Sequence, residues 1–307
     1  MSNLTPTAPG SGIASRPLFG ISAALTTPFS PDGAVDTERM CRHARAVLAA
    51  GASSVTLFGT TGEGASLDDG DRGLALDAAR AGGIGAASIV VGICAPSAGG
   101  AIAQIRQAVE HGVGTVLLPP PFFFKAVSEA GLFAWYSKVL GAFEGAALRV
   151  ILYHIPQVTG VPLSLPLIRD LKKAFPALVY GVKDSAGVWA DSEKLLGEKD
   201  LAILIGDERH LAAAARLGGA GAISGMANLI PARLARMLAT GEADSGIDAL
   251  VNVVVGFPVT PAVKAMVAHV RADPQWAEVR APLEPTEAAN AAKINAMLDG
   301  LMAAEAA

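Results

Sequence analysis

The chain has 307 residues, of which 51% are hydrophobic and 17% are charged. Its 24 basic and 28 acidic residues give a formal net charge of −4, which argues against a nucleic-acid partner, because proteins that bind nucleic acid carry a basic surface. The apolar runs are too short to cross a membrane, and 2 cysteines exclude both a disulfide framework and a four-thiolate metal site.

Residues 1–17 (MSNLTPTAPGSGIASRP) lack the basic start and the apolar core of a secretory signal. We expect them to form a mobile N-terminal tail, and we expect the protein to be cytoplasmic. The 5 histidines are scattered without the spacing of metal ligands, so we expect no metal and no cofactor. A magnesium ion held by carboxylates alone remains open.

From residue 18 to residue 240, short β-branched runs alternate with Ala- and Leu-rich segments at a period of about 30 residues. The strands are continuous apolar runs, as expected when both faces of a strand are buried. The predicted strands are Ile21–Thr26, Ser54–Phe58, Ile89–Ile93, Thr115–Leu118, Val150–His154, Val179–Lys183, Ile203–Gly206 and Gly221–Ser224. The predicted helices are Thr37–Ala50, Asp68–Ala81, Ala98–His111, Glu129–Phe143, Leu165–Phe175, Asp191–Leu196, Arg209–Leu217 and Pro231–Thr240.

This alternation predicts an α/β fold, the (β/α)8 TIM barrel, over residues 18–240. A doubly wound open sheet is the competing architecture, but it is expected to carry a G-x-G-x-x-G turn, and the sequence has none. After residue 240 the strands cease, and residues 241–307 predict a C-terminal helical extension of about three helices.

A barrel of this kind places its functional side chains at the carboxyl ends of the strands and in the loops that follow. The second predicted strand runs into residues 58–64 (FGTTGEG), in which Gly59, Thr60 and Thr61 combine hydroxyl donors with close backbone approach. This pattern suits binding of a small carboxylate or phosphate. The alternative is a glycine-rich turn capped by threonine.

The fifth strand ends at Tyr153 and His154, and the sixth ends at Lys183. If Tyr153 faces the barrel interior, His154 faces the helices, because neighbours on a strand point to opposite sides. A buried lysine favours its neutral amine, so Lys183 at the end of an apolar strand predicts a Schiff-base nucleophile. The structural alternatives are that Tyr153 is only a packed core residue and that Lys183 forms an ion pair with Asp184. The other lysines are expected to lie on helices or loops where the ammonium group reaches solvent.

Asp207 and Glu208 follow the seventh strand, and Ser224 ends the eighth. The two carboxylates are candidates for binding hydroxyl groups or for acid–base chemistry. The alternative is structural: Asp207 caps a helix, and Glu208 lies in the first turn, where the helix dipole favours a negative charge.

Three segments in this order and spacing resemble the dihydrodipicolinate synthase / N-acetylneuraminate lyase family: residues 59–63 (GTTGE), 153–160 (Y-x-I-P-x-x-x-G) and 181–184 (GVKD). The resemblance covers residues 18–301 and implies a barrel with a helical extension, assembled as a homotetramer or homodimer. It also implies a pyruvate-dependent class I aldolase or a related dehydratase. The catalytic residues would be Lys183 as the imine-forming amine, Tyr153 as the proton carrier and Thr60, which with Thr61 holds the substrate carboxylate.

The sequence departs from the family members that make the lysine precursor. Those synthases carry an arginine five residues after the strand-five tyrosine, where this chain has Val158. They also take a tyrosine from a neighbouring subunit in the loop after the fourth strand, and residues 119–125 (PPPFFFK) contain none. Asp207 and Glu208 resemble the acids that hold sugar hydroxyls in sialic-acid lyases, and Ser185 occupies the position of a hydroxyl residue there.

These departures favour a Schiff-base lyase that cleaves or forms a 4-hydroxy-2-oxo acid, of the 2-keto-3-deoxy sugar acid class, with pyruvate as one partner. Dihydrodipicolinate synthase and a dehydratase of 2-keto-3-deoxy sugar acids that uses the same imine are the alternatives. The expected substrate-binding residues are Gly59, Thr60, Thr61, Ser185, Asp207, Glu208 and Ser224.

Overall fold

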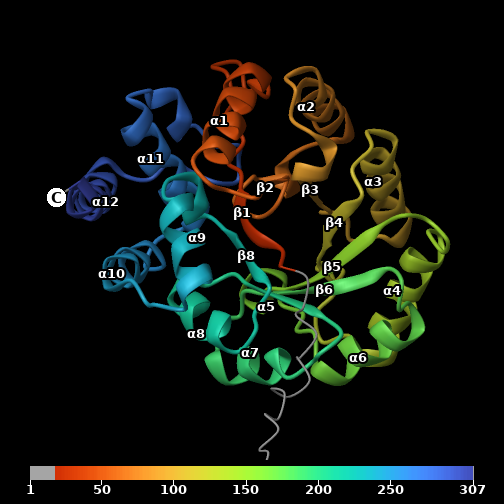
Figure 1. The fold of residues 1–307 in the computed structure, drawn as a ribbon. Helices are drawn as coiled ribbons and strands as arrows, with labels where there is room; N and C mark the ends of the chain where they lie inside the picture. Colours follow the sequence, from red (N-terminus) through yellow and green to blue (C-terminus); the bar gives the residue numbers. More distant parts are fainter. Residues whose placement is uncertain (1–17, 307) are drawn as a thin grey trace, which may run out of the picture.

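The structure, a computed structural model, describes residues 18–306, with side chains described through residue 303. The expected tail at residues 1–17 lies outside the described residues. Within them, eight parallel strands form a closed barrel in which each strand pairs with the next and β8 pairs with β1 (Figure 1). The strands are β1 (Gly20–Ala24), β2 (Ser54–Leu57), β3 (Ile89–Gly92), β4 (Thr115–Leu118), β5 (Arg149–His154), β6 (Val179–Asp184), β7 (Ala202–Ile205) and β8 (Gly221–Ser224). The predicted (β/α)8 barrel is therefore confirmed.

Helices surround this barrel, and further helices follow it in the sequence. Those that alternate with the strands are α1 (Thr37–Ala49), α2 (Asp69–Ala81), α3 (Ala98–Glu110), α4 (Glu129–Gly141), α5 (Pro156–Thr159), α6 (Leu165–Ala174), α7 (Trp189–Leu196), α8 (Leu211–Arg216) and α9 (Pro231–Thr240). Polar residues cap several of them at the N-terminus: the side chain of Ser164, for example, accepts from the backbone N–H of Leu167 at 3.2 Å.

The element ends differ from the predicted ones where the backbone turns sharply. Strand β2 ends at Leu57, one residue early, because Phe58 adopts a left-handed φ of 59° that a strand cannot contain. The one-turn helix α5 was not predicted, and it places Pro156 at its first position. Helix α8 begins at Leu211 instead of Arg209, because a 3-10 turn occupies Glu208–His210.

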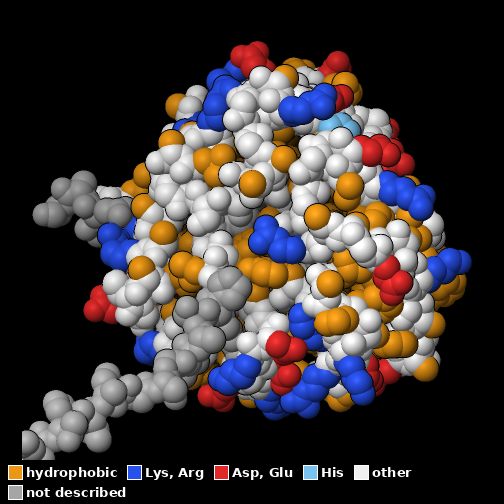
Figure 2. Space-filling model, turned by 45° about the vertical axis from the view of Figure 1, so that its right-hand side comes forward, with side chains coloured by type: hydrophobic (Ala, Val, Ile, Leu, Met, Phe, Trp, Pro, Cys, Tyr) orange, Lys and Arg blue, Asp and Glu red, His pale blue; other side chains and the backbone are white. Residues whose placement is uncertain are grey.

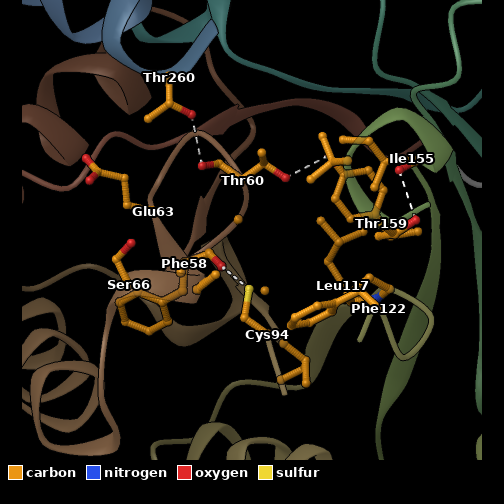
Figure 3. A pocket seen from close by; sticks show the side chains of 18 of the residues that line it. Phe58, Thr60, Glu63, Ser66, Cys94, Leu117, Phe122, Ile155, Thr159 and Thr260 are labelled. Atoms are coloured by element: carbon orange, nitrogen blue, oxygen red, sulfur yellow. Dashed lines mark hydrogen bonds between the residues drawn. The ribbon is translucent and has the colours of Figure 1, made fainter. Parts of the chain in front are cut away.

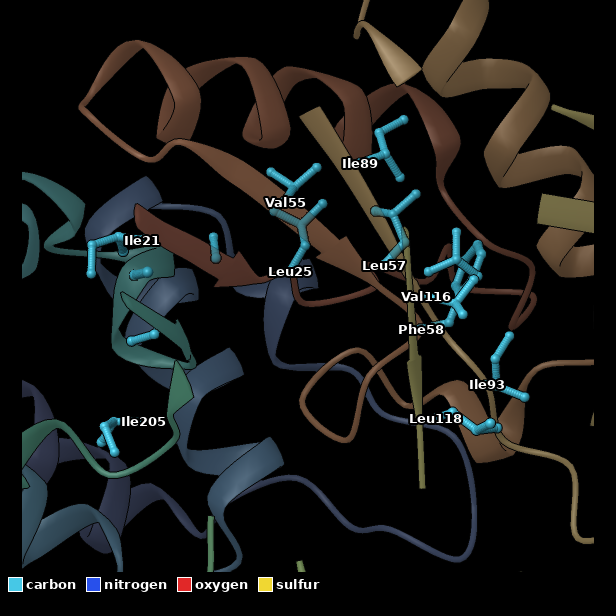
Figure 4. Close-up of a cluster of buried hydrophobic side chains, with 14 of the residues drawn as sticks. Ile21, Leu25, Val55, Leu57, Phe58, Ile89, Ile93, Val116, Leu118 and Ile205 are labelled. Atoms are coloured by element: carbon cyan, nitrogen blue, oxygen red, sulfur yellow. The ribbon is translucent and has the colours of Figure 1, made fainter. Parts of the chain in front are cut away.

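Side chains that alternate along the strands build two apolar layers. One lies between strands and helices and includes Val55, Leu57, Ile89 and Val116 (Figure 4). The other fills the barrel interior, and its members are Ala24, Val90, Leu117, Ile151, Tyr153, Ile155, Ala202, Leu204, Ala220 and Ile223. The alternation puts Tyr153 inside and His154 outside, where the Nδ1 of His154 accepts from the backbone N–H of Leu163 at 3.0 Å.

The pairing of β6 with β5 includes one extra residue on the β6 side. Val150 pairs with Val179, but the next residue, Ile151, pairs with Gly181, so Tyr180 forms a β-bulge. Beyond the bulge, Tyr153 pairs with Lys183.

Three further helices follow α9 in the described residues: α10 (Ser245–Val254), α11 (Val259–Arg271) and α12 (Ala288–Ala306). They lie together on one side of the barrel, beside α8, α9 and α1 (Figure 1). The division into a barrel at residues 18–240 and an extension at residues 241–307 stays a prediction.

The surface carries mixed charge. On the face drawn in Figure 2, basic and acidic side chains are interspersed among apolar ones instead of being gathered by sign. Among the described helices, none combines the length and the apolar character that crossing a membrane requires.

Candidate active site

Lys183, Tyr153 and Thr60 form a connected set of polar groups at the carboxyl end of the barrel. Lys183 Nζ donates to Tyr153 Oη over 3.1 Å, and Tyr153 Oη lies 3.3 Å from Thr60 Oγ1. Lys183 Nζ also lies 4.3 Å from the centre of the tyrosine ring. Lys183 is only 6% exposed, and the tyrosine bond is its one polar contact that we identify among the described residues.

Close packing restricts the residues beside this lysine on β6. A Cβ on Gly181, two residues earlier on the same face, would lie 2.1 Å from the carbonyl oxygen of Ala202, so only glycine fits there. The neighbouring Asp184 faces outward, where its carboxylate accepts from Ser192 Oγ at 2.5 Å and from the backbone N–H of Ala186 at 3.1 Å. The structure therefore pairs Asp184 with Ser192, and the ion pair with Lys183 is not formed.

Lys183 opens into a cavity of about 350 Å³ at the mouth of the barrel. Thr60, Thr61, Tyr153 and Ser185 line it together with the lysine. A Cβ on Gly206 would lie 1.9 Å from Ser185 Oγ, so the glycine after β7 leaves the space that Ser185 occupies. The cavity is large enough for a small organic acid and brings hydroxyl, phenol and amine groups to one place.

The loop that carries Thr60 and Thr61 folds tightly over residues 58–64. Phe58 and Glu63 both adopt left-handed φ values, 59° and 54°, which are uncommon for residues with a side chain. A Cβ on Gly64 would lie 1.9 Å from the carbonyl oxygen of Phe58, and one on Gly62 would lie 2.7 Å from that of Leu25. The two glycines are therefore required by close backbone approach.

Buried contacts hold this loop in place. Glu63 Oε1 accepts from Lys264 Nζ at 2.5 Å, and Glu63 Oε2 accepts from the backbone N–H of Arg280 at 2.9 Å. Lys264 Nζ also donates to the carbonyl oxygen of Thr27, whose own hydroxyl donates to the carbonyl of Gly62 at 2.7 Å. Burial lowers the pKa of Lys264, and the attraction of Glu63 opposes this shift.

The side chain of Lys264 is fully buried, which corrects the expectation that lysines other than Lys183 reach solvent. The expectation was wrong because the buried carboxylate of Glu63 comes from a loop some 200 residues away in the sequence. The local pattern around Lys264, an amphipathic helix, gives no sign of this partner. A lysine within the apolar run VTPAVKAMV (residues 259–267) was the available signal.

The acids after β7 both lie at the cavity, and each has a partner. Asp207 accepts from Arg209 through Nε at 2.9 Å and Nη2 at 2.6 Å, and it also caps the turn by accepting from the backbone N–H of Arg209. Burial opposes ionisation of Asp207, but its bonds to Arg209 outweigh this and hold the pKa of the carboxyl below its usual value.

Glu208 is more deeply buried than Asp207. Its Oε1 accepts from Ser224 Oγ at 2.5 Å, and the Ser224 hydroxyl in turn accepts from the backbone N–H of Ala227 at 3.1 Å. Burial raises the pKa of Glu208, and the bond from Ser224 opposes the shift. Glu208 and Ser224 thus satisfy each other, while Ser185 and Asp207 face the cavity from neighbouring loops.

A second cavity of about 320 Å³ adjoins the first (Figure 3), and the two share Thr60, Tyr153, Ile155, Val158 and Thr260. Its walls are mainly apolar, with Phe58, Leu117 and Phe122 among them. Two of its polar side chains are bonded within the protein: Cys94 Sγ contacts the carbonyl oxygen of Phe58, and Thr159 donates to that of Ile155. The amine of Lys183 belongs to the first cavity alone.

The comparisons with known proteins agree with this geometry. A sequence model described as the Dihydrodipicolinate synthetase family matches residues 17–300. The chain is similar to a protein from Chloroflexus aurantiacus described as an uncharacterized DapA-like lyase, with 34% identity over 92% of this chain and 97% of that protein. It is also similar to a 4-hydroxy-tetrahydrodipicolinate synthase from Methanosarcina mazei, with 29% identity over 71% of this chain and 74% of the relative.

A solved structure supports the same relationship. The crystal structure of a dihydrodipicolinate synthase from Agrobacterium tumefaciens superposes with a TM-score of 0.89 and 48% sequence identity. The alignment covers 92% of this chain and 99% of that one.

Proposed function

This chain belongs to the dihydrodipicolinate synthetase family, and from that premise we propose that it is a lyase whose Lys183 forms an imine with pyruvate or another 2-oxo acid. The observation that carries the proposal is the chain of contacts from Lys183 Nζ to Tyr153 Oη at 3.1 Å and on to Thr60 Oγ1 at 3.3 Å. An amine, a phenol and a hydroxyl in one cavity are the groups that carbonyl chemistry needs.

The first half of the reaction forms the imine. The neutral amine of Lys183 attacks C2 of the 2-oxo acid, while the hydroxyl of Thr61 and the backbone of its loop hold the carboxylate. Tyr153 then gives its phenol proton to the carbinolamine hydroxyl, which leaves as water. The iminium and the tyrosinate remain, and Thr60 keeps the tyrosine oxygen oriented by its hydrogen bond.

The second half breaks the C3–C4 bond. The tyrosinate takes the proton of the C4 hydroxyl, the bond breaks, and its electron pair moves into the iminium to give an enamine and a free aldehyde. Tyr153 returns its proton to C3. Water then adds to C2 and passes a proton to Tyr153, so pyruvate leaves and the amine of Lys183 is regenerated. Condensation is the same sequence in reverse.

For the substrate class we favour a 2-keto-3-deoxy sugar acid. The support is the polar part of the lysine cavity's lining, which includes Ser185, Gln157 and the Asp207–Arg209 pair. Such groups suit the hydroxyls at the far end of a sugar acid. The Asp207–Arg209 pair has no net charge, so it provides no free cation for a second carboxylate. A dehydratase acting on the same sugar acids would use the same imine and lose the C4 hydroxyl as water.

A second candidate, dihydrodipicolinate synthase, is favoured by the 48% identity to the Agrobacterium tumefaciens structure of that name. It would condense pyruvate with aspartate semialdehyde, whose carboxylate needs a cation. Val158, 58% exposed at the mouth of the cavity, supplies none. We therefore expect low kcat/KM with aspartate semialdehyde, and we expect Val158→Arg to raise it. Efficient turnover by the unmodified protein would make this the better assignment.

The imine is tested by trapping. Borohydride added with pyruvate should reduce the imine, leave a stable adduct on Lys183 that peptide mass spectrometry locates, and inactivate the enzyme. Lys183→Ala should form no adduct, whereas Lys173→Met, at an exposed position on α6, should behave as the unmodified protein. An adduct on another lysine, or none, would contradict the proposal. The family resemblance implies a homodimer or a homotetramer, and light scattering tests this by measuring the molar mass in solution.

A further inference from the structure

Helix α11, outside the barrel in sequence, contacts the loop of Thr60 at two places: Lys264 bonds Glu63, and the hydroxyl of Thr260 reaches Thr60 itself. Thr260, the second residue of that helix, donates from Oγ1 to the backbone carbonyl oxygen of Thr60 at 3.1 Å. The two residues are 200 positions apart in the chain. Thr260 is buried and borders both cavities, and Figure 3 shows its side chain directed at Thr60.

The hydroxyl of Thr260 has no role in starting its own helix. The N-cap position of α11 is Pro258, and no side chain caps the helix. A capping threonine would bond backbone N–H groups of its own first turn, whereas Thr260 donates away from the helix. This bond therefore serves the barrel loop.

The loop needs such a bond because its backbone is strained. Phe58 and Glu63, on either side of Thr60, hold left-handed φ values, which are unfavourable for residues with a side chain and persist only where surrounding contacts enforce them. Among the described residues, the one other bond that we identify to the carbonyl of Thr60 comes from the backbone N–H of Glu63 at 3.1 Å, within the same loop. Thr260 thus ties the residue in the middle of the strained segment to a rigid helix.

The position of the Thr60 backbone sets the position of its side chain. Thr60 Oγ1 lies 3.3 Å from Tyr153 Oη, and that phenol lies 3.1 Å from Lys183 Nζ. The Thr60–Tyr153 distance is already at the long end for a hydrogen bond between hydroxyls, so a small loop movement would break it. Loss of the Thr260 bond would therefore disturb the Thr60–Tyr153 contact, and with it the orientation of the phenol that carries the proton.

We propose that Thr260 is a positioning residue: its hydroxyl fixes the Thr60 backbone so that Thr60 orients Tyr153 for proton transfer. The proposal rests on the proposed function, because it assigns Tyr153 the proton-transfer step. It makes the helical extension part of the active site. Thr260→Val removes the hydroxyl and keeps the shape, and Thr260→Ser keeps the hydroxyl and removes one methyl group.

The experiment separates positioning from a loss of folded protein. Borohydride trapping with pyruvate counts the sites that form an imine. The kcat for cleavage of a 2-keto-3-deoxy sugar acid is then expressed per trapped site. Thr260→Val should lower this corrected kcat by roughly 2- to 12-fold, the effect of one neutral hydrogen bond, while the trapped fraction stays near that of the unmodified protein. Thr260→Ser should restore kcat. Thr240→Val, which removes a hydroxyl bonded to the carbonyl of Arg236 on α9, should leave it unchanged.

Each result supports or contradicts one of the two proposals. If the unmodified protein traps no pyruvate, the imine-forming function is wrong. If it traps pyruvate but Thr260→Val keeps full kcat per trapped site, the positioning role is wrong. A loss of activity in Thr260→Val that matches a loss of trapped sites, or that Thr260→Ser does not reverse, also contradicts the positioning role, because a residue needed only for folding gives that pattern.

Discussion

Tyr153 and Lys183 stand side by side on strands β5 and β6, with Lys183 Nζ 3.1 Å from Tyr153 Oη. The β-bulge at Tyr180 makes this pairing possible. Without that extra residue the register beyond it would shift by one, and Val182 would stand beside Tyr153. A shift of one residue also turns every side chain of a strand to the opposite face. The bulge therefore decides that Lys183, and not Val182, lies beside Tyr153 and faces the barrel interior.

Tyr153→Phe tests the proton carrier. The substitution removes the phenol hydroxyl that contacts both Lys183 and Thr60, so we expect kcat to fall by roughly 10²- to 10⁴-fold, the usual contribution of a positioned acid or base. The imine should still be trapped by borohydride, but more slowly, because the amine of Lys183 remains while the phenol that protonates the carbinolamine hydroxyl is gone. Tyr180→Phe, at the bulge, is the matched control and should retain activity. Near-normal turnover by Tyr153→Phe would remove the phenol from the mechanism.

Asp207 and Glu208 can be separated by measuring Tm and KM on the same variants. If the acids serve the substrate, Glu208→Gln should raise KM for a sugar-acid substrate without changing imine formation with pyruvate. If Asp207 serves only as a cap, Asp207→Ala should cost about 1 kcal/mol of stability and leave KM unchanged. A lower Tm combined with an unchanged KM in both variants would favour a short-chain 2-oxo acid.

The buried pair of Glu63 and Lys264 predicts a non-additive effect on stability. Lys264→Met leaves the buried carboxylate without a partner and should destabilise the protein by about 3–5 kcal/mol. The double variant Glu63→Gln with Lys264→Met removes both charges and should lose less than the single variant. Arg42→Met, which breaks an exposed pair with Glu38, should change little. Chemical denaturation measures all three, and a double variant less stable than Lys264→Met would refute this interpretation.

His43 predicts a loss of stability in mild acid. Burial lowers its pKa from 6.5 to about 4, with a bond to Asn228 opposing the shift and the charge of Arg271 adding to it. The neutral ring is favoured in the folded state, so its full contribution is present above pH 6.5 and is lost as the pH falls toward 4. The shift corresponds to about 3 kcal/mol.

Denaturation of the unmodified protein and of His43→Gln at several pH values between 7.5 and 4 checks this prediction. The variant should show a shallower fall in unfolding free energy over the range in which the histidine titrates. Equal pH dependence of the two proteins would mean that His43 is not held neutral.

Several features could be predicted from the sequence because they depend on local pattern. Continuous apolar runs separated by amphipathic segments predict a buried parallel sheet covered by helices, and the structure has the eight strands within a residue or two of the predicted ends. Lys183 stands out in the sequence because a lysine rarely ends an apolar strand, and the structure buries it at the lysine cavity, while its catalytic role stays a prediction. The opposite facing of Tyr153 and His154 followed from the two-residue period of a strand.

Other features depended on contacts between distant segments, which no local pattern reports. The bulge at Tyr180 lies in the pairing of β6 with β5, and the sequence around it shows only a tyrosine in a strand. The bonds from Lys264 to Glu63 and from Thr260 to Thr60 each join residues about 200 positions apart. Whether a polar side chain on a helix is exposed or is a buried anchor is decided by what packs against it, and that partner exists only once the barrel has closed.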